Sequence, residues 1–201
     1  MNKTNLQIWL FYICGKKRLS ISPHNLDYFQ THFVGHQMKQ NWRRPPAEVR
    51  GKTLRLKDFV GWMFQVPVCS ERAKLALEPI ISHCAEFLPL ILIRGINYYA
   101  INVVKVVDCL DKKRSEVAYY DHNPKKIMAI HSYVFLKNKI ENVPIFKVPE
   151  LDSSTVFVTQ KFVDVIIANK LTGVSFADPS INRWDYVLGK REPNKVAGVL
   201  T

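Results

Sequence analysis

Two apolar runs rich in β-branched residues constrain the fold of this chain most strongly. They are Glu86–Ile93 and Tyr98–Leu110. Runs of this length and composition are typical of strands buried in a sheet. We expect 98–110 to form one long strand that ends in a charged turn at 111–115. Val117–Asp121 should then pair back on this strand as a hairpin.

Shorter stretches of similar character lie on both sides of these runs. They predict further strands at 6–14, 127–130, 133–136, 144–148, 156–158 and 174–177. The basic, proline-containing stretch 15–58 lacks a long period and predicts loops with short elements, one of them a helical turn near 25–32. The chain is therefore expected to contain much more strand than helix.

Two segments show the spacing of an amphipathic helix. In the first, Ser70 is the expected N-cap of an apolar face that begins at Ala73. Pro79 lies inside this segment and should kink the helix or divide it in two. In the second, Thr159 is the expected N-cap and Gly173 stands where a C-terminal cap would. These patterns predict an α+β fold, mainly antiparallel sheet with two or more packed helices.

The length and the cysteine content limit how the chain can be organised. Its 201 residues suit a single α+β domain over 1–186, followed by a flexible tail at 187–201. The longest apolar stretches fall far short of the roughly 20 residues that a bilayer-spanning helix needs. The four cysteines (Cys14, Cys69, Cys84 and Cys109) form no CxxC pair, and we expect them to be reduced and buried, as is usual in the cytoplasm.

Charge is the strongest compositional signal for a binding partner. The net charge is +12, and residues 1–58 carry +8 of it, with eleven Lys and Arg against three Asp and Glu. Such a basic face attracts nucleic acid, an anionic membrane or an acidic protein. The candidate contact residues are the aromatic–arginine cluster and the basic turn: Trp42, Arg43, Arg44, Arg50, Lys112, Lys113 and Arg114.

Motifs for catalysis, metal binding or cofactor binding are weak in this sequence. His32 and His36 have the spacing of one helical turn, but zinc would need a further ligand. Gly-rich phosphate loops and nucleophile-elbow motifs do not occur in it. Asp108 interrupts an apolar run, so we expect it to be partly buried and to accept hydrogen bonds. We assign Ser70, Asp108, Thr159 and Gly173 structural roles, and we expect no catalytic residue, metal or cofactor.

An ordered set of short segments resembles immunity protein family 11 of bacterial polymorphic-toxin systems. The segments are Val66–Ala73, Leu77–Ile80, Glu86–Leu90, Tyr98–Val103, Val107–Asp111, Ser115–Glu116, Ile145–Pro149, Val156–Thr159 and Leu171–Gly173. The resemblance covers roughly residues 40–185, and residues 1–40 are less similar to the family. It implies a non-enzymatic antitoxin that binds a cognate bacterial toxin and blocks it.

Two alternatives from other functional classes remain open at this stage. The net charge and the Trp42–Arg44 cluster would also suit a nucleic-acid-binding module. Carboxylates around Asp108 and Asp111 would suit an enzyme with an unrecognised site. For the antitoxin, we expect a toxin with an acidic contact surface and no membrane or nucleic-acid partner. The oligomeric state does not follow from the sequence.

Overall fold

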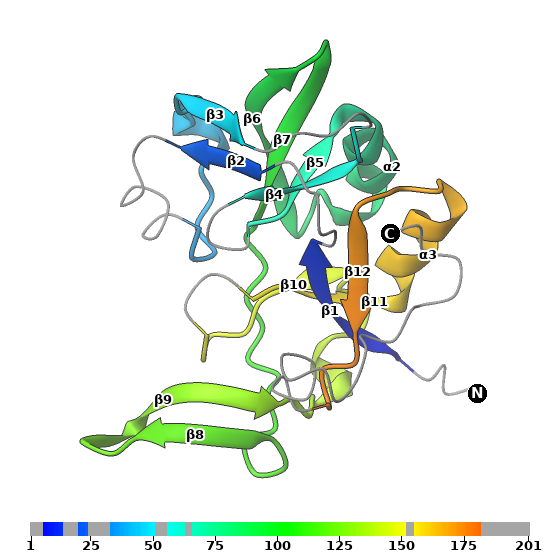
Figure 1. Cartoon of the computed structure of the whole chain (residues 1–201). Helices are drawn as coiled ribbons and strands as arrows, with labels where there is room; N and C mark the ends of the chain where they lie inside the picture. Colours follow the sequence, from blue (N-terminus) through cyan, green and yellow to red (C-terminus); the bar gives the residue numbers. More distant parts are fainter. Residues whose placement is uncertain are drawn as a thin grey trace.

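Three β-sheets and two α-helices make up the described part of the chain (Figure 1). The computed structural model describes residues 6–13, 20–23, 33–50, 56–62, 66–151 and 155–181, with residues 20–23 and Trp62 described by their backbone alone. Most strand pairs are antiparallel; the exception among these residues is the pair β2–β4. The expected class, α+β and mainly antiparallel sheet, is confirmed.

The first sheet has four strands in the order β10-β11-β1-β12. Their bounds are Ile145–Phe146 for β10, Phe157–Thr159 for β11, Ile8–Ile13 for β1 and Val174–Ala177 for β12. The strand β1 lies between two partners, and its two faces pack into different clusters. Trp9 and Phe11 contact one apolar cluster, whereas Ile8 and Leu10 contact another. Burial on both faces explains why β1 is apolar throughout rather than alternating.

The second sheet has six strands in the order β3-β2-β4-β5-β7-β6. Their bounds are Ala47–Arg50 for β3, Ser20–Pro23 for β2, Phe59–Trp62 for β4, Val68–Ser70 for β5, Ile96–Val103 for β7 and Ala85–Ile93 for β6. A two-residue turn joins β6 to β7, and both of its residues, Arg94 and Gly95, have positive φ. This geometry matches the twist of the paired strands.

The helices close the core between the two larger sheets. They are α2 at Glu71–Ile81 and α3 at Gln160–Ala168, and two short 3₁₀ turns lie at Lys39–Asn41 (η1) and Lys137–Lys139 (η3). Leu77 of α2 and Phe162 of α3 are fully buried in the same cluster as Phe11 and Phe59, which come from the two sheets. One apolar cluster thus joins both sheets and both helices.

The third sheet is a two-stranded hairpin that reaches away from the other elements (Figure 1). It consists of β8 at Glu116–Tyr120 and β9 at Asn123–Ser132, and we call it the arm. Its register shifts at three places, so β9 carries extra residues relative to β8. Val117 and Ile127 pack against a cluster of the body, whereas the distal residues 121–126 are exposed.

The expected strand at 98–110 is wrong in its second half. β7 ends at Val103, which pairs with Ala85, the first residue of β6. Because its sheet partner ends there, the chain leaves the sheet, and two isolated bridges hold Val106 and Leu110. The expected hairpin partner is also wrong, because 116–120 pairs with β9.

The expectations for the helices are confirmed in position and corrected in detail. Ser70 is the N-cap of α2, and its side chain accepts a hydrogen bond from the Ala73 amide. The helix continues through Pro79 without division, because Pro79 lies only two residues before its end. Thr159 occupies the N-cap position of α3 but makes no side-chain capping hydrogen bond.

Gly173 is not the cap of α3, contrary to expectation. The helix ends at Ala168, and Lys170 has the positive φ that follows its end. Gly173 has φ +91°, and a Cβ there would lie 2.3 Å from the Phe59 carbonyl oxygen. Its role is to let two backbone segments approach closely.

The other strand expectations are confirmed at 8–13, 85–93, 145–146, 157–159 and 174–177, and 127–130 lies within β9. Residues 133–136 form no strand, and the expectations for 25–32 and 187–201 lie outside the described residues.

Candidate partner-binding surface

Trp42 fixes the basic segment that sequence analysis singled out. Its indole Nε1 donates to the Pro89 carbonyl oxygen at 2.8 Å, and its ring meets Phe33 edge-on at 6.1 Å. Upstream, the Glu86 carboxylate accepts the backbone amides of Met38 and Lys39 at 2.7 and 3.3 Å. The segment is thus tied to the edge strand β6, and Trp42 is half-buried rather than a free aromatic anchor.

The arginines that follow differ in how they are held. Arg43 and Arg44 are exposed, and among the described residues neither side chain has a hydrogen bond or an ion pair. Arg50 pairs with Glu48 at 2.6 Å, and both side chains are largely exposed. An exposed ion pair of this kind contributes little to stability. The two arginines without partners are therefore the stronger candidates for contact with another molecule.

The predicted basic turn at 111–115 is present and is organised by Asp111. The Asp111 carboxylate accepts the backbone amides of Lys113 and Arg114 at 3.2 and 3.3 Å. Lys112 pairs at 3.0 Å with Glu150, whose side chain is only 4% exposed. The two groups of candidate residues are not brought together, since β3 and the arm lie at opposite ends of the view in Figure 1.

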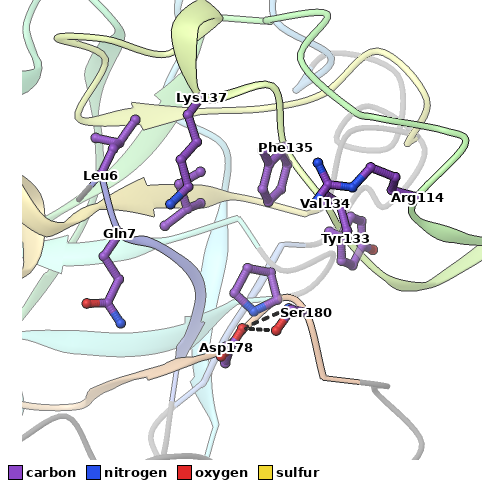
Figure 2. Close-up of a pocket in the computed structure, with 11 residues that line it drawn as sticks. Leu6, Gln7, Arg114, Tyr133, Val134, Phe135, Lys137, Asp178 and Ser180 are labelled. Carbon is purple, nitrogen blue, oxygen red and sulfur yellow. Dashed lines mark hydrogen bonds between the residues drawn. The ribbon is translucent and has the colours of Figure 1, made fainter. Parts of the chain in front are cut away.

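Two cavities flank this basic turn. The first has a volume of about 600 Å³, and Figure 2 shows Arg114 and Lys137 on one side of it and Asp178 and Ser180 on the other. The second has a volume of about 590 Å³ and lies between the arm and the body, with Lys112 among its lining residues. The turn therefore contributes a cation to each cavity.

Asp108 is not the buried carboxylate that its sequence context predicted. Its side chain is 73% exposed, and its nearest cation is Lys139 at 3.8 Å. The expectation assumed a continuous strand, and the chain is irregular there. The enzyme alternative that centred on Asp108 and Asp111 also loses its geometric basis, because Asp111 is occupied with the turn.

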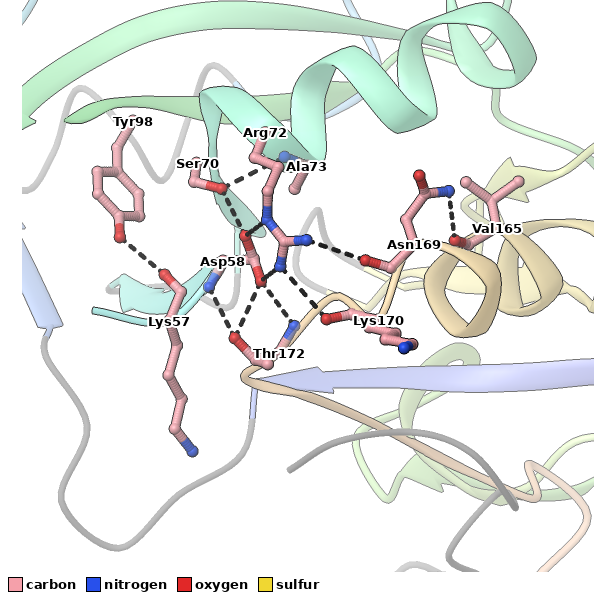
Figure 3. Close-up of polar contacts among 10 residues, drawn as sticks. All are labelled: Lys57, Asp58, Ser70, Arg72, Ala73, Tyr98, Val165, Asn169, Lys170 and Thr172. Carbon is pink, nitrogen blue, oxygen red and sulfur yellow. Dashed lines mark hydrogen bonds and ion pairs between the residues drawn. The ribbon is translucent and has the colours of Figure 1, made fainter. Parts of the chain in front are cut away.

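The buried carboxylate is Asp58, which the sequence analysis missed. Figure 3 shows its two oxygens surrounded by donors from two segments of the chain, residues 70–72 and Thr172. Arg72 donates to both oxygens at 3.0 and 2.5 Å, Ser70 donates its hydroxyl at 3.0 Å, and Thr172 donates its amide and hydroxyl at 2.8 and 2.9 Å. Arg72 also donates to the carbonyl oxygen of Asn169 at the end of α3. The network ties α2 to the segment between α3 and β12.

The surroundings of Asp58 set its charge state. Burial would raise the pKa of this carboxyl, but the hydrogen bonds from Arg72, Thr172 and Ser70 outweigh it and lower the pKa below the ordinary value. A sequence signal was available, because Asp58 is the only acidic residue between Glu48 and Glu71 and directly precedes an apolar strand. The charged carboxylate of Asp58 therefore stabilises the fold and does not act as a catalytic group.

A second buried charge belongs to Lys147. Its ammonium donates to the Phe33 carbonyl oxygen, and burial lowers its pKa to about 8. Its backbone joins the irregular segment after β7, where its amide donates to the Lys105 carbonyl oxygen at 2.9 Å. Lys147 therefore connects three loops beneath the sheets, and a partner cannot reach this side chain from solvent.

The cysteines are not arranged for nucleophilic chemistry. Cys69, Cys84 and Cys109 are buried and free of disulfides, as expected, and Cys14 lies outside the described residues. Burial raises the pKa of each of these thiols, to about 12 for Cys109, so they stay protonated at neutral pH. Among the residues that the structure describes, no group of three or more His, Cys, Asp or Glu side chains could hold a metal ion.

The comparisons with known proteins decide the family. The model of an immunity protein family, Imm11, matches residues 21–180. The chain belongs to this family. Its members neutralise a toxin by binding it and are not catalysts, which removes the enzyme alternative. The match also includes residues 21–40, which sequence analysis had placed outside the resemblance. No curated protein matches the chain.

The family assignment explains the character of the candidate surface. An immunity protein acts through a contact surface, so exposed cations without partners matter more for it than a pocket with reactive groups. The described helices are all too short or too polar to cross a membrane.

Proposed function

We propose that this immunity protein captures its cognate toxin in the cytoplasm by docking on an acidic surface of the toxin. The observation that carries the proposal is the pair Arg43 and Arg44, which are exposed and have no partner among the described residues. Trp42 and Glu86 hold the backbone of their segment in place. Fixed, unpaired charges steer an oppositely charged partner without a large cost in ordering.

The cytoplasmic location is supported by the cysteines. Three cysteines in the described part of the chain are buried and form no disulfide. Disulfides are rare in the reducing cytoplasm and form readily in secreted proteins. A producing cell is protected where the toxin meets its target, so binding in the same compartment would serve that purpose.

Charge reversal tests the proposed docking. In the double variant Arg43→Glu/Arg44→Glu, the association rate with the cognate toxin should fall roughly tenfold at low salt. The dissociation rate should change less, because rim charges act mainly on encounter. Stopped-flow or surface-based kinetics at two salt concentrations measure both rates. The matched control is Lys161→Glu/Lys170→Glu, which changes the net charge equally at exposed positions on and after α3.

The nucleic-acid alternative makes a different prediction for the same protein. Binding to generic DNA or RNA would be tight and would weaken steeply with salt, because bound phosphates release counterions. If such binding persists at physiological salt without any toxin, docking on an acidic protein is not the function of these arginines. Equal association rates for the arginine variant and its control would contradict the proposal as well.

A further inference from the structure

The cavity between the arm and the body has the features of a binding cleft. Its volume is about 590 Å³. Segments from both sides line it, and the residues are Asp108, Lys112, Lys125, Lys126, Ile127, Pro149 and Glu150. The cleft thus has an apolar part formed by Ile127 and Pro149 and a ring of charged groups. Such a mixture suits a segment of a protein better than a purely apolar ligand.

The charges around the cleft are unbalanced. Lys112 is neutralised by Glu150 at 3.0 Å, and Asp108 lies 3.8 Å from Lys139, which does not line the cleft. Lys126 lies 5.4 Å from the centre of the Tyr120 ring. Neither Lys125 nor Lys126 has a carboxylate partner among the described residues. Two ammonium groups on the arm are therefore available to an anionic occupant.

Glu150 supplies a second, independent indication of an occupant. Its side chain is 4% exposed, and only one carboxylate oxygen, Oε1, receives the Lys112 ammonium. The other oxygen, Oε2, is buried and has no hydrogen-bond partner among the described residues. A buried acceptor without a donor is unfavourable. A backbone N–H of an inserted segment would satisfy it, and an anion without a hydrogen-bond donor, such as sulfate, would not.

The arm packs against the body through Val117 and Ile127 and leaves other large side chains exposed. Its exposed side chains include Tyr119 at 40% and Met128 at 55%. An isolated two-stranded hairpin is marginally stable in water, so a long arm gains from a partner that covers it. Tyrosine and methionine are also enriched at protein interfaces.

We propose that this cleft holds an acidic segment of the toxin, inserted between the arm and the body. Carboxylates of the segment pair with Lys125 or Lys126, a backbone N–H donates to Glu150 Oε2, and apolar atoms contact Ile127. The inference rests on toxin binding and names the place where the toxin is held. Arg43 and Arg44 act on encounter, whereas the cleft determines how long the complex persists.

Kinetics of charge-reversal variants test the cleft. In Lys125→Glu/Lys126→Glu, the dissociation rate of the same toxin should rise at least about tenfold, because charges inside a contact act on dissociation. The control Lys161→Glu/Lys170→Glu should leave it unchanged. Thermal unfolding of each variant alone should stay close to that of the parent protein, since the arm lysines have no carboxylate partner and lose only the contact between Lys126 and the Tyr120 ring. An unchanged dissociation rate would overturn the inference. It would also be overturned if the parent protein bound RNA and the arm variant lost RNA binding but kept toxin binding.

Zero-length cross-linking provides a direct test of placement. A carbodiimide joins an ammonium to a carboxylate only when they touch, without adding a spacer. In the parent complex, we expect mass spectrometry to find Lys125 or Lys126 joined to an Asp or Glu of the toxin. Cross-links only at other lysines would contradict the placement of the toxin segment in the cleft but would still be consistent with toxin binding. If the parent protein does not bind the toxin at all, the proposed function itself fails.

Discussion

At the scale of single residues, local sequence context is a poor guide to which charges are buried. Asp108 lies among Val, Cys and Leu, yet it is exposed, whereas Asp58 follows a basic stretch and is 7% exposed. The difference arises because the donors to Asp58 come from residues 12 to 114 positions away along the chain. Only the folded chain brings Ser70, Arg72 and Thr172 together, so no local pattern could predict the network.

The two aspartates provide a matched pair for a stability test. Asp58→Ala should destabilise the protein by about 2–4 kcal/mol, because it leaves buried donors unpaired; the figure allows for the partial exposure of Arg72. Asp108→Ala should change stability by less than about 0.5 kcal/mol, as for other exposed ion pairs. Urea denaturation of both variants measures this difference.

The pH dependence follows from the lowered pKa of Asp58. Because the folded state holds this carboxyl in its charged form, its contribution is present above the ordinary carboxyl range and is lost as the pH falls through the folded pKa. The stability gap between the parent protein and Asp58→Ala should therefore shrink in acid. A gap that stays constant from neutral to acidic pH would contradict the assigned role of Asp58.

At the scale of elements, strands and helices were predicted well where the chain itself carries the signal. Apolar runs located β1, β6 and β7, and cap residues located the starts of α2 and α3. The pairing partners and the ends of the strands were harder to predict, because they depend on where neighbouring strands stop. The end of β7 at Val103 reflects the start of β6, and the pairing of β8 with β9 reflects a turn at 121–122.

The two helix caps should differ in strength. Ser70→Ala removes both a capping acceptor for Ala73 and a donor to Asp58, so we expect a loss of about 1–2 kcal/mol. Thr159→Ala removes no capping hydrogen bond, so its cost should be clearly smaller. Chemical denaturation midpoints compare the two variants. An equal or larger loss for Thr159→Ala would show that its hydroxyl has a role that the cap geometry does not explain.

At the scale of the whole molecule, we propose that residues 1–186 form one domain. The main apolar cluster contains side chains from both larger sheets and from both helices, and the Asp58 network crosses the same junction. The family was predictable because its segments occur in order along the chain. The cleft was not, since it depends on how the arm stands away from the body. Lys112 was singled out from sequence, whereas Lys125 and Glu150 became candidates only through their positions.

This chain neutralises its toxin by binding it, and a stoichiometric titration tests that most directly. Increasing amounts of the purified protein are added to a fixed amount of the cognate toxin, and the residual toxin activity is measured. We predict a linear loss that is complete at one equivalent, with the toxin recovered unmodified and active after the complex is dissociated. Persistent activity at excess protein, or loss at far less than one equivalent with a covalent change in the toxin, would contradict the account.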